Sequence, residues 1–169
     1  LGINPFDQPD VQRAKDASTR VLAHYEEHGR WPEVEAINSL PELLATLRPG
    51  DYFCILAYLR QRAELDAAFS DLRRRVGTRH RVSTTLGYGP RYLHSTGQLH
   101  KGGPNTCVLL QVCSRHPNDV PIPDKGYSFG TVADAQALGD LQALNSLDRR
   151  VARVVLEEDD SALLPAALL

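Results

Sequence analysis

Apolar runs alternate with amphipathic stretches from about residue 51 to residue 157. The apolar runs predict four strands, in the segments DYFCILAYL, RVSTTLGYG, NTCVLLQV and VARVVLE. Between them, apolar positions recur every three or four residues at 63–77, which predicts a helix, and a further helix is expected at 131–145. NTCVLLQV is continuously apolar, as in strands that are buried on both faces of a parallel sheet. The alternation predicts an α/β fold, a three-layer sandwich around a mainly parallel sheet.

A helical segment precedes this body. Residues 8–27 carry a broken apolar face, with Asp7 as the expected N-cap, Pro9 in the first turn and Gly29 directly after the end. A linker-like stretch then leads to a short helix at 41–47, which Pro49 and Gly50 stop.

These patterns indicate two parts: an N-terminal helical appendage at 1–48 and an α/β domain at 49–169. The chain contains no methionine, and Leu1–Ile3 has the composition of the end of a strand, so we expect a piece of a longer polypeptide. The tail DDSALLPAALL carries apolar residues that must dock on something.

Composition narrows the class of function. The 19 basic and 21 acidic residues give a net charge of −2, which argues against nucleic acid or an anionic membrane as partner. Three cysteines match neither a zinc-ligand pattern nor a disulfide framework, so a reducing, cytoplasmic location is expected. No apolar run approaches the roughly 20 residues of a membrane span. The expected partners are small molecules or protein.

The densest polar chemistry lies at 84–105, between two of the predicted strands. In parallel sheets ligands bind outside the carboxyl ends of strands, where residues 87–105 and 114–129 would lie. His94, with Ser95 and Gln98 to orient a polyol, is suited to acid/base chemistry on a small, oxygen-rich anion. A partly buried histidine bonded to a backbone carbonyl is the alternative.

Other polar residues carry weaker signals. His100 and Lys101 are expected at a solvent-exposed helix end. Gln8 and Lys15 share a helical face, and Lys15 is either a surface charge or a functional cation. The six-residue gap between His94 and His100 does not suit a metal site, and no dinucleotide or phosphate-loop pattern occurs, so neither metal nor cofactor is expected.

Two motifs resemble one family. NPFDQPDVQRAK at 4–15 resembles the FDQ-containing signature of phosphoglucose isomerases, and LHSTGQ at 93–98 resembles their LHSxGQ segment. The longer stretches at 86–105 and 126–144 are similar to the carboxyl-terminal part of bifunctional transaldolase/phosphoglucose isomerase fusion proteins. The resemblance covers nearly the whole chain.

The resemblance implies a sugar-isomerase (SIS) α/β sandwich that interconverts glucose 6-phosphate and fructose 6-phosphate without a metal. Lys15 and His94 match catalytic residues, and Gln8 matches a residue near the substrate; Ser95 and Gln98 are the further expected substrate contacts. Ring opening needs a proton moved between O1 and O5, and the isomerisation needs a carboxylate and a nearby cation.

The chain departs from the family pattern in three ways. Asp10 replaces a usual glycine and Gln12 a usual glutamate. Lys15 precedes His94 by 79 residues, the reverse of the common order, and the catalytic glutamate and phosphate loop of the first half are not found. We therefore expect the carboxyl-terminal part of the isomerase, inactive alone, whose partners are a phosphorylated hexose and the N-terminal part of the same polypeptide.

Two questions are open at this point. The alternative function is a non-catalytic SIS module that binds a phosphosugar without converting it. A homo-oligomer is also open, because the segment at 4–27 could exchange onto a neighbouring molecule.

Overall fold

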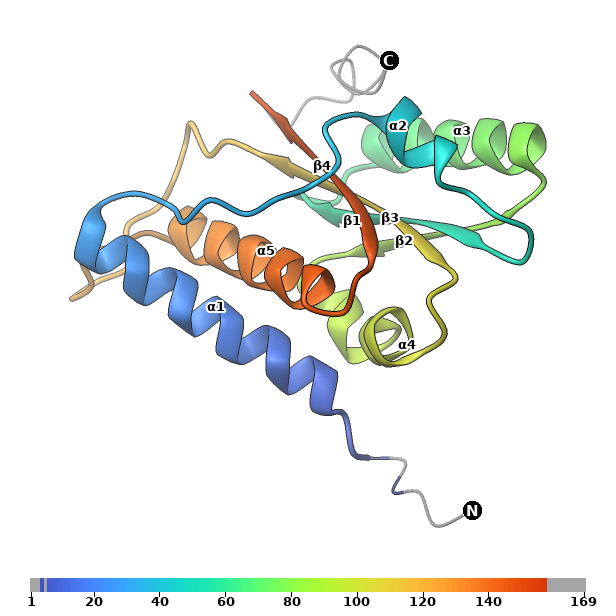
Figure 1. Cartoon of the computed structure of the whole chain (residues 1–169). Helices are drawn as coiled ribbons and strands as arrows, with labels where there is room; N and C mark the ends of the chain where they lie inside the picture. Colours follow the sequence, from blue (N-terminus) through green and yellow to red (C-terminus); the bar gives the residue numbers. More distant parts are fainter. Residues whose placement is uncertain (1–3, 5, 158–169) are drawn as a thin grey trace.

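The computed structural model describes residue 4 and residues 6–157, which form an α/β fold with a four-stranded, all-parallel sheet flanked by helices (Figure 1). The predicted strand end at residues 1–3 and the tail at 159–169 lie outside the described residues. The strands are β1 (Tyr52–Tyr58), β2 (Ser83–Tyr88), β3 (Cys107–Ser114) and β4 (Arg150–Leu156). The helices are α1 (Pro9–His28), α2 (Leu40–Ala45), α3 (Ala63–His80), the 3-10 helix η1 (Arg91–His94), α4 (Gly97–Gly102) and α5 (Phe129–Asn145). The predicted α/β class is confirmed.

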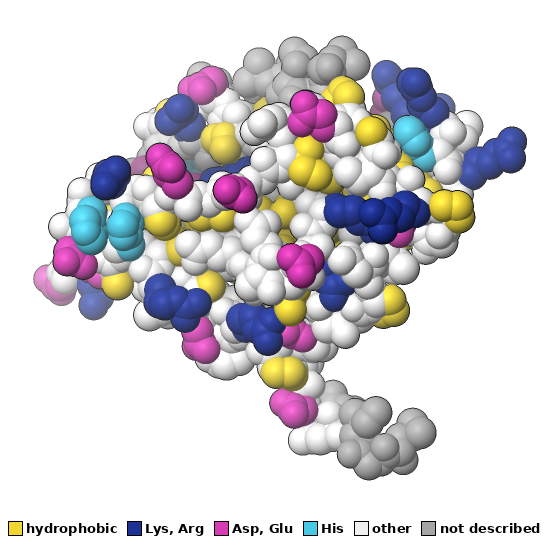
Figure 2. Space-filling model, viewed as in Figure 1, with side chains coloured by type: hydrophobic (Ala, Val, Ile, Leu, Met, Phe, Trp, Pro, Cys, Tyr) yellow, Lys and Arg dark blue, Asp and Glu magenta, His cyan; other side chains and the backbone are white. Residues whose placement is uncertain are grey.

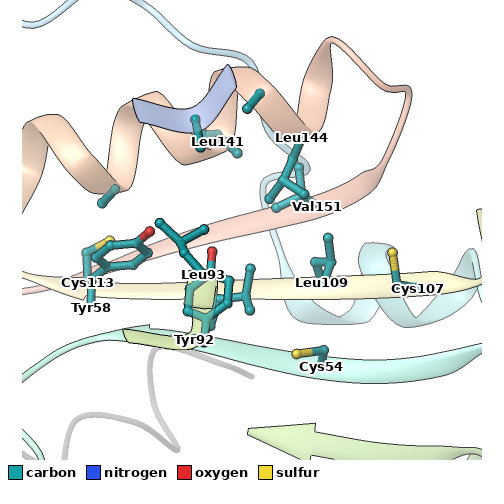
Figure 3. Close-up of a cluster of buried hydrophobic side chains, with 14 residues drawn as sticks. Cys54, Tyr58, Tyr92, Leu93, Cys107, Leu109, Cys113, Leu141, Leu144 and Val151 are labelled. Carbon is teal, nitrogen blue, oxygen red and sulfur yellow. The ribbon is translucent and has the colours of Figure 1, made fainter. Parts of the chain in front are cut away.

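The strand order is β2-β1-β3-β4, so β1 and β3 occupy the centre of the sheet. Every residue of β3 is buried, as its continuous apolar sequence predicted. Side chains of β1 alternate: Phe53 and Ile55 pack against α2 and α3, whereas Cys54 and Leu56 face the side of α5. The second of these two cores, built around α5, the strands and η1, is drawn in Figure 3.

Helix α5 is buried on two sides, because it lies between the sheet and α1 (Figure 1). The contact with α1 is close: a Cβ atom added at Gly139 would lie 2.4 Å from the backbone nitrogen of Ser18. Ala14 and Ala17 of α1 are buried, and their small side chains are consistent with this close approach. Through it α1 packs on the α/β body, while the division of the chain into residues 1–48 and 49–169 stays a prediction.

Helix α1 begins one residue later than predicted and ends at His28, one residue beyond the predicted end. Gln8, not Asp7, occupies the N-cap position, so the expected N-cap was wrong. The reason is a preceding turn, in which Asn4 accepts the backbone N–H groups of Phe6 and Asp7. At the other end Gly29 adopts φ 66°, a left-handed conformation that glycine tolerates without strain, and its N–H caps the last turn.

The surface carries mixed charge on the face drawn in Figure 2, where Lys and Arg side chains lie among Asp and Glu side chains rather than in one patch. Such a face creates no strong field of a single sign. None of the helices in the described part of the chain is long and apolar enough to cross a membrane.

Candidate functional site

The first motif occupies the N-terminal turns of α1. Gln8 occupies the N-cap position without a side-chain capping hydrogen bond and is exposed, and Lys15 is exposed two turns along. The buried side of this part of α1 is formed by Asp10, Val11 and Ala14. Since successive residues turn by about 100°, Gln8 and Lys15 lie on one side of the helix, next to its buried face.

The second motif does not form one continuous helix. It divides into η1 and α4, with Ser95 and Thr96 between them. His94 and Ser95 are exposed, and the Ser95 hydroxyl donates to the backbone oxygen of Tyr92 at 3.1 Å. Leu93, beside His94, is buried in the core under α5. Because Leu93 is buried and His94 is exposed, the His94 side chain faces solvent rather than bonding inside the core.

A pair of hydrogen bonds joins the two motifs across 88 residues of sequence. The Gln98 side-chain nitrogen donates to Asp10 Oδ2 at 2.7 Å, and the Asp10 backbone nitrogen donates to Gln98 Oε1 at 3.2 Å. A Cβ atom at Gly102 would lie 2.2 Å from the Gln98 amide nitrogen and 2.6 Å from Asp10 Oδ2, so a glycine there makes room for the pair. Asp10, the departure from the family pattern, is thus the residue that connects α1 to α4.

His100 and Lys101 contradict the prediction of a solvent-exposed helix end. Each is only 1% exposed, because the last turn of α4 packs inward against the sheet and α5. The Lys101 ammonium lies 2.5 Å from Asp140 Oδ1, and both side chains are fully buried. The second oxygen of Asp140 accepts the hydroxyl proton of Tyr92 in η1. A buried charge needs such a partner, and the sequence spacing alone did not show it.

His100 lies in a closed pocket next to this ion pair. Its Nδ1 shares a hydrogen bond of 2.8 Å with the Tyr52 hydroxyl, and its Nε2 lies 3.6 Å from the Cys54 sulfur. Burial and the adjacent Lys101 ammonium lower the pKa of His100 to about 4. Burial raises the pKa of the Cys54 thiol to about 12. Both groups are therefore neutral at pH 7 and unsuited to nucleophilic or acid/base chemistry there.

A separate surface cavity of about 930 Å³ opens at the carboxyl ends of β1 and β3. Its lining includes Gly89 and Pro90 after β2, the segment 114–120 after β3, and the first turns of α5. The sequence predicted a ligand site at this edge; a cavity lies there, and ligand binding in it stays a prediction. None of the residues Gln8, Lys15, His94, Ser95 and Gln98 lines it.

The walls of the cavity carry both basic and acidic side chains. Arg60, Arg62 and Arg115 contribute to its walls, and Arg115 pairs with Glu157 at 2.8 Å. Asp119 accepts the backbone N–H groups of Gly130 and Val120, each at 2.8 Å. Although desolvation acts to raise the pKa of Asp119, these bonds and a bond from the Ser128 hydroxyl hold that pKa below its usual range. The carboxylate of Asp119 thus occupies the N-terminus of α5, where an anion would otherwise bind.

Sequence reasoning missed Asp140, Tyr92 and Lys101 as interacting residues. One signal was present: Asp140 stands alone among apolar neighbours in the segment ALGDLQAL of the predicted helix. An acidic residue flanked by apolar ones in a helix indicates a buried carboxylate with a cationic partner.

No protein-family model and no curated protein sequence matches this chain. Its fold is similar to the crystal structure of hypothetical protein TT0462 from Thermus thermophilus, with a TM-score of 0.59 and 20% identical residues. The similarity covers 94% of this chain and 41% of that one, so the chain spans about two fifths of the length of that protein. At this identity the likeness shows the fold alone.

Proposed function

We propose that the chain is the carboxyl-terminal part of a glucose-6-phosphate isomerase of the transaldolase-fusion type. The observation that carries this proposal is the pair of hydrogen bonds between Asp10 and Gln98. The two motifs that resemble one enzyme family are far apart in sequence, yet this contact joins them in the fold. Each motif also carries an exposed side chain, Lys15 in the first and His94 in the second. The segments that carry these two side chains are therefore joined by hydrogen bonds.

The two exposed groups suit the two parts of the reaction. His94 carries an accessible imidazole that can move a proton between O1 and O5 as the pyranose ring opens. Lys15 supplies a cation for the oxyanion that develops during enediol formation. The carboxylate that shuttles the proton between C1 and C2 would belong to another part of the enzyme. The proposed substrate is a phosphorylated hexose of cytoplasmic sugar metabolism, and no metal or cofactor takes part.

Gln98 and Gln8 have different roles in this proposal. The Gln98 side chain already bonds to Asp10 through both its oxygen and its nitrogen, which leaves one N–H for a substrate hydroxyl. Gln8 occupies the N-cap position of α1 without a side-chain capping hydrogen bond and is exposed, so its amide is accessible to substrate. Ser95 is exposed beside His94, and its hydroxyl oxygen retains acceptor capacity after donating to Tyr92.

A second candidate function is binding of a phosphosugar without conversion, and the cavity at the carboxyl edge of the sheet favours it. Arg60 and Arg115 on its walls could pair with a phosphate there. Glucose 6-phosphate titrated into the ¹⁵N-labelled protein separates the two sites. Shifts confined to 114–120 and the start of α5 would support the binding module, and shifts around 8–15 and 94–98 would support the isomerase.

The test of the isomerase proposal is His94→Ala in the full-length protein, with His28→Ala as an exposed histidine control. Turnover of cyclic glucose 6-phosphate should fall by about a hundredfold, the usual contribution of a proton-transferring side chain. Turnover of a sugar phosphate that cannot close its ring should fall much less. Equal losses on both substrates would contradict a ring-opening role, and no loss on either would remove His94 from the reaction.

A further inference from the structure

One buried carboxylate holds both ends of the segment at 92–101. Asp140 in α5 accepts the Tyr92 hydroxyl on one oxygen, and its other oxygen lies 2.5 Å from the Lys101 ammonium. Tyr92 stands two residues before His94, and Lys101 lies in the last turn of the helix that contains Gln98. The Lys101 ammonium also lies 5.8 Å from the centre of the Tyr92 ring, so the three groups form one cluster.

Stability alone does not account for this cluster. Both charges are fully buried, and the cost of removing two charges from water often matches or exceeds their mutual attraction. A pair of apolar side chains of similar volume would commonly stabilise such a site as well or better. The best-attested benefit of a buried ion pair is that it selects one arrangement of the elements it joins.

In this protein the ion pair fixes the position of the segment at 92–101, which carries the predicted site residues His94, Ser95 and Gln98. Tyr92 and Lys101 both contact Asp140 in α5, and Gln98 is hydrogen-bonded to Asp10 in α1. The turn between η1 and α4 lies between these contacts in the sequence. Arg149 adds a further anchor by donating to the backbone oxygens of Lys101 and Gly103. His94 and Ser95 are therefore exposed on a segment whose two ends, Tyr92 and Lys101, make buried contacts with Asp140.

We propose that Asp140, together with Lys101, is a positioning residue that fixes His94 for the isomerase reaction. This inference rests on the proposed function. Asp140 does not touch substrate; it acts through the backbone of 92–101. Displacement of a catalytic group by about 1 Å can lower the rate by about a hundredfold, so a loosened segment should cost turnover rather than substrate affinity.

The test uses the full-length protein with Lys101→Met and Asp140→Leu combined. The double substitution removes both charges, because a single one would leave an unpaired buried charge and could prevent folding. Leu138→Ala is the control, since it truncates a buried side chain of the same helix in the cluster that faces α1. Hydrogen exchange of residues 92–101, thermal melting, and kcat and KM with fructose 6-phosphate are measured for each.

We expect the double variant to melt cooperatively, to exchange the amides of 92–101 at least about tenfold faster than the wild type, and to lose about tenfold or more in kcat with little change in KM. Leu138→Ala should melt at a lower temperature without either change. Exchange in 92–101 at the wild-type rate would overturn the positioning role. Faster exchange with unchanged kcat would overturn its link to catalysis. A wild-type protein without isomerase activity would refute the proposed function, while the exchange comparison still decides whether the cluster fixes the segment.

Discussion

Replacing Gly139 by alanine should force α1 away from α5. The new Cβ would lie 2.4 Å from the Ser18 backbone nitrogen and 2.5 Å from its Cα, about 1 Å inside ordinary contact. These are backbone atoms, so no side-chain rotation relieves the overlap. Overpacking of this kind costs up to about 3 kcal/mol, and the better helix propensity of alanine returns about 1 kcal/mol. The expected net loss is about 2 kcal/mol.

The assay is thermal unfolding followed by far-UV circular dichroism. For a chain of this size 2 kcal/mol lowers Tm by about 6 °C. The control is Gly126→Ala, because an added Cβ there meets nothing within 4 Å. The displaced helix also carries Gln8 and Lys15, so the proposed isomerase turnover of the full-length protein should fall with Gly139→Ala but not with the control. A Gly139→Ala protein that melts at or above the wild-type Tm would refute the proposed packing of α1 on α5.

Two further predictions concern buried titratable groups. The pKa of His100 in the folded protein is lowered to about 4. Between pH 6.5 and 4 the unfolded chain therefore binds a proton at this residue that the folded chain does not. The free energy of unfolding should fall by on the order of 3 kcal/mol as the pH drops from 7 to 4. His100→Asn, which can keep the bond to the Tyr52 hydroxyl, should flatten this slope in urea unfolding; an unchanged slope would show that His100 is not the group responsible. Asp51 forms a two-pronged pair with Arg150 at 2.6 and 3.0 Å, and bonding to this guanidinium lowers its pKa. Its contribution should therefore be complete above the ordinary carboxyl pKa of about 4 and decrease as the pH falls below it, so Asp51→Asn should cost about 2 kcal/mol at pH 7 and less at pH 2; equal losses at both pH values would contradict this.

The elements of the fold could be predicted from the sequence because their signals are local. The run at 107–112 is apolar except for Gln111, which is typical of a strand buried on both faces of a parallel sheet, and β3 is such a strand. The N-terminal end of α1 was wrong by one residue, because Asp7 belongs to the turn at Asn4, Pro9 has no N–H to donate to a cap at Asp7, and the Asp10 N–H donates to Gln98 instead.

The contacts of the site could not be predicted, because they join residues that no local pattern connects. Lys101 resembles any charge near a helix end until Asp140 is placed against it, and that placement depends on how α4 and α5 pack on the sheet. The same holds for Asp10 and Gln98. The exposure of His94 and Lys15 agrees with a role at a surface site, and their catalytic roles stay predictions.

The most direct measurement of the central claim is isomerase activity of the full-length protein with Lys15→Ala, Lys15→Arg and, as a control cation on the same helix, Arg20→Ala. At saturating fructose 6-phosphate, Lys15→Ala should lower turnover by about a hundredfold, because an essential charge near the developing oxyanion is lost. Lys15→Arg should recover only part of it, since a planar guanidinium does not replace a compact ammonium, and Arg20→Ala should retain full activity. Near-full turnover of Lys15→Ala, with an unchanged thermal melt, would show that Lys15 is a surface charge and would contradict the claim that the two motifs form one isomerase site.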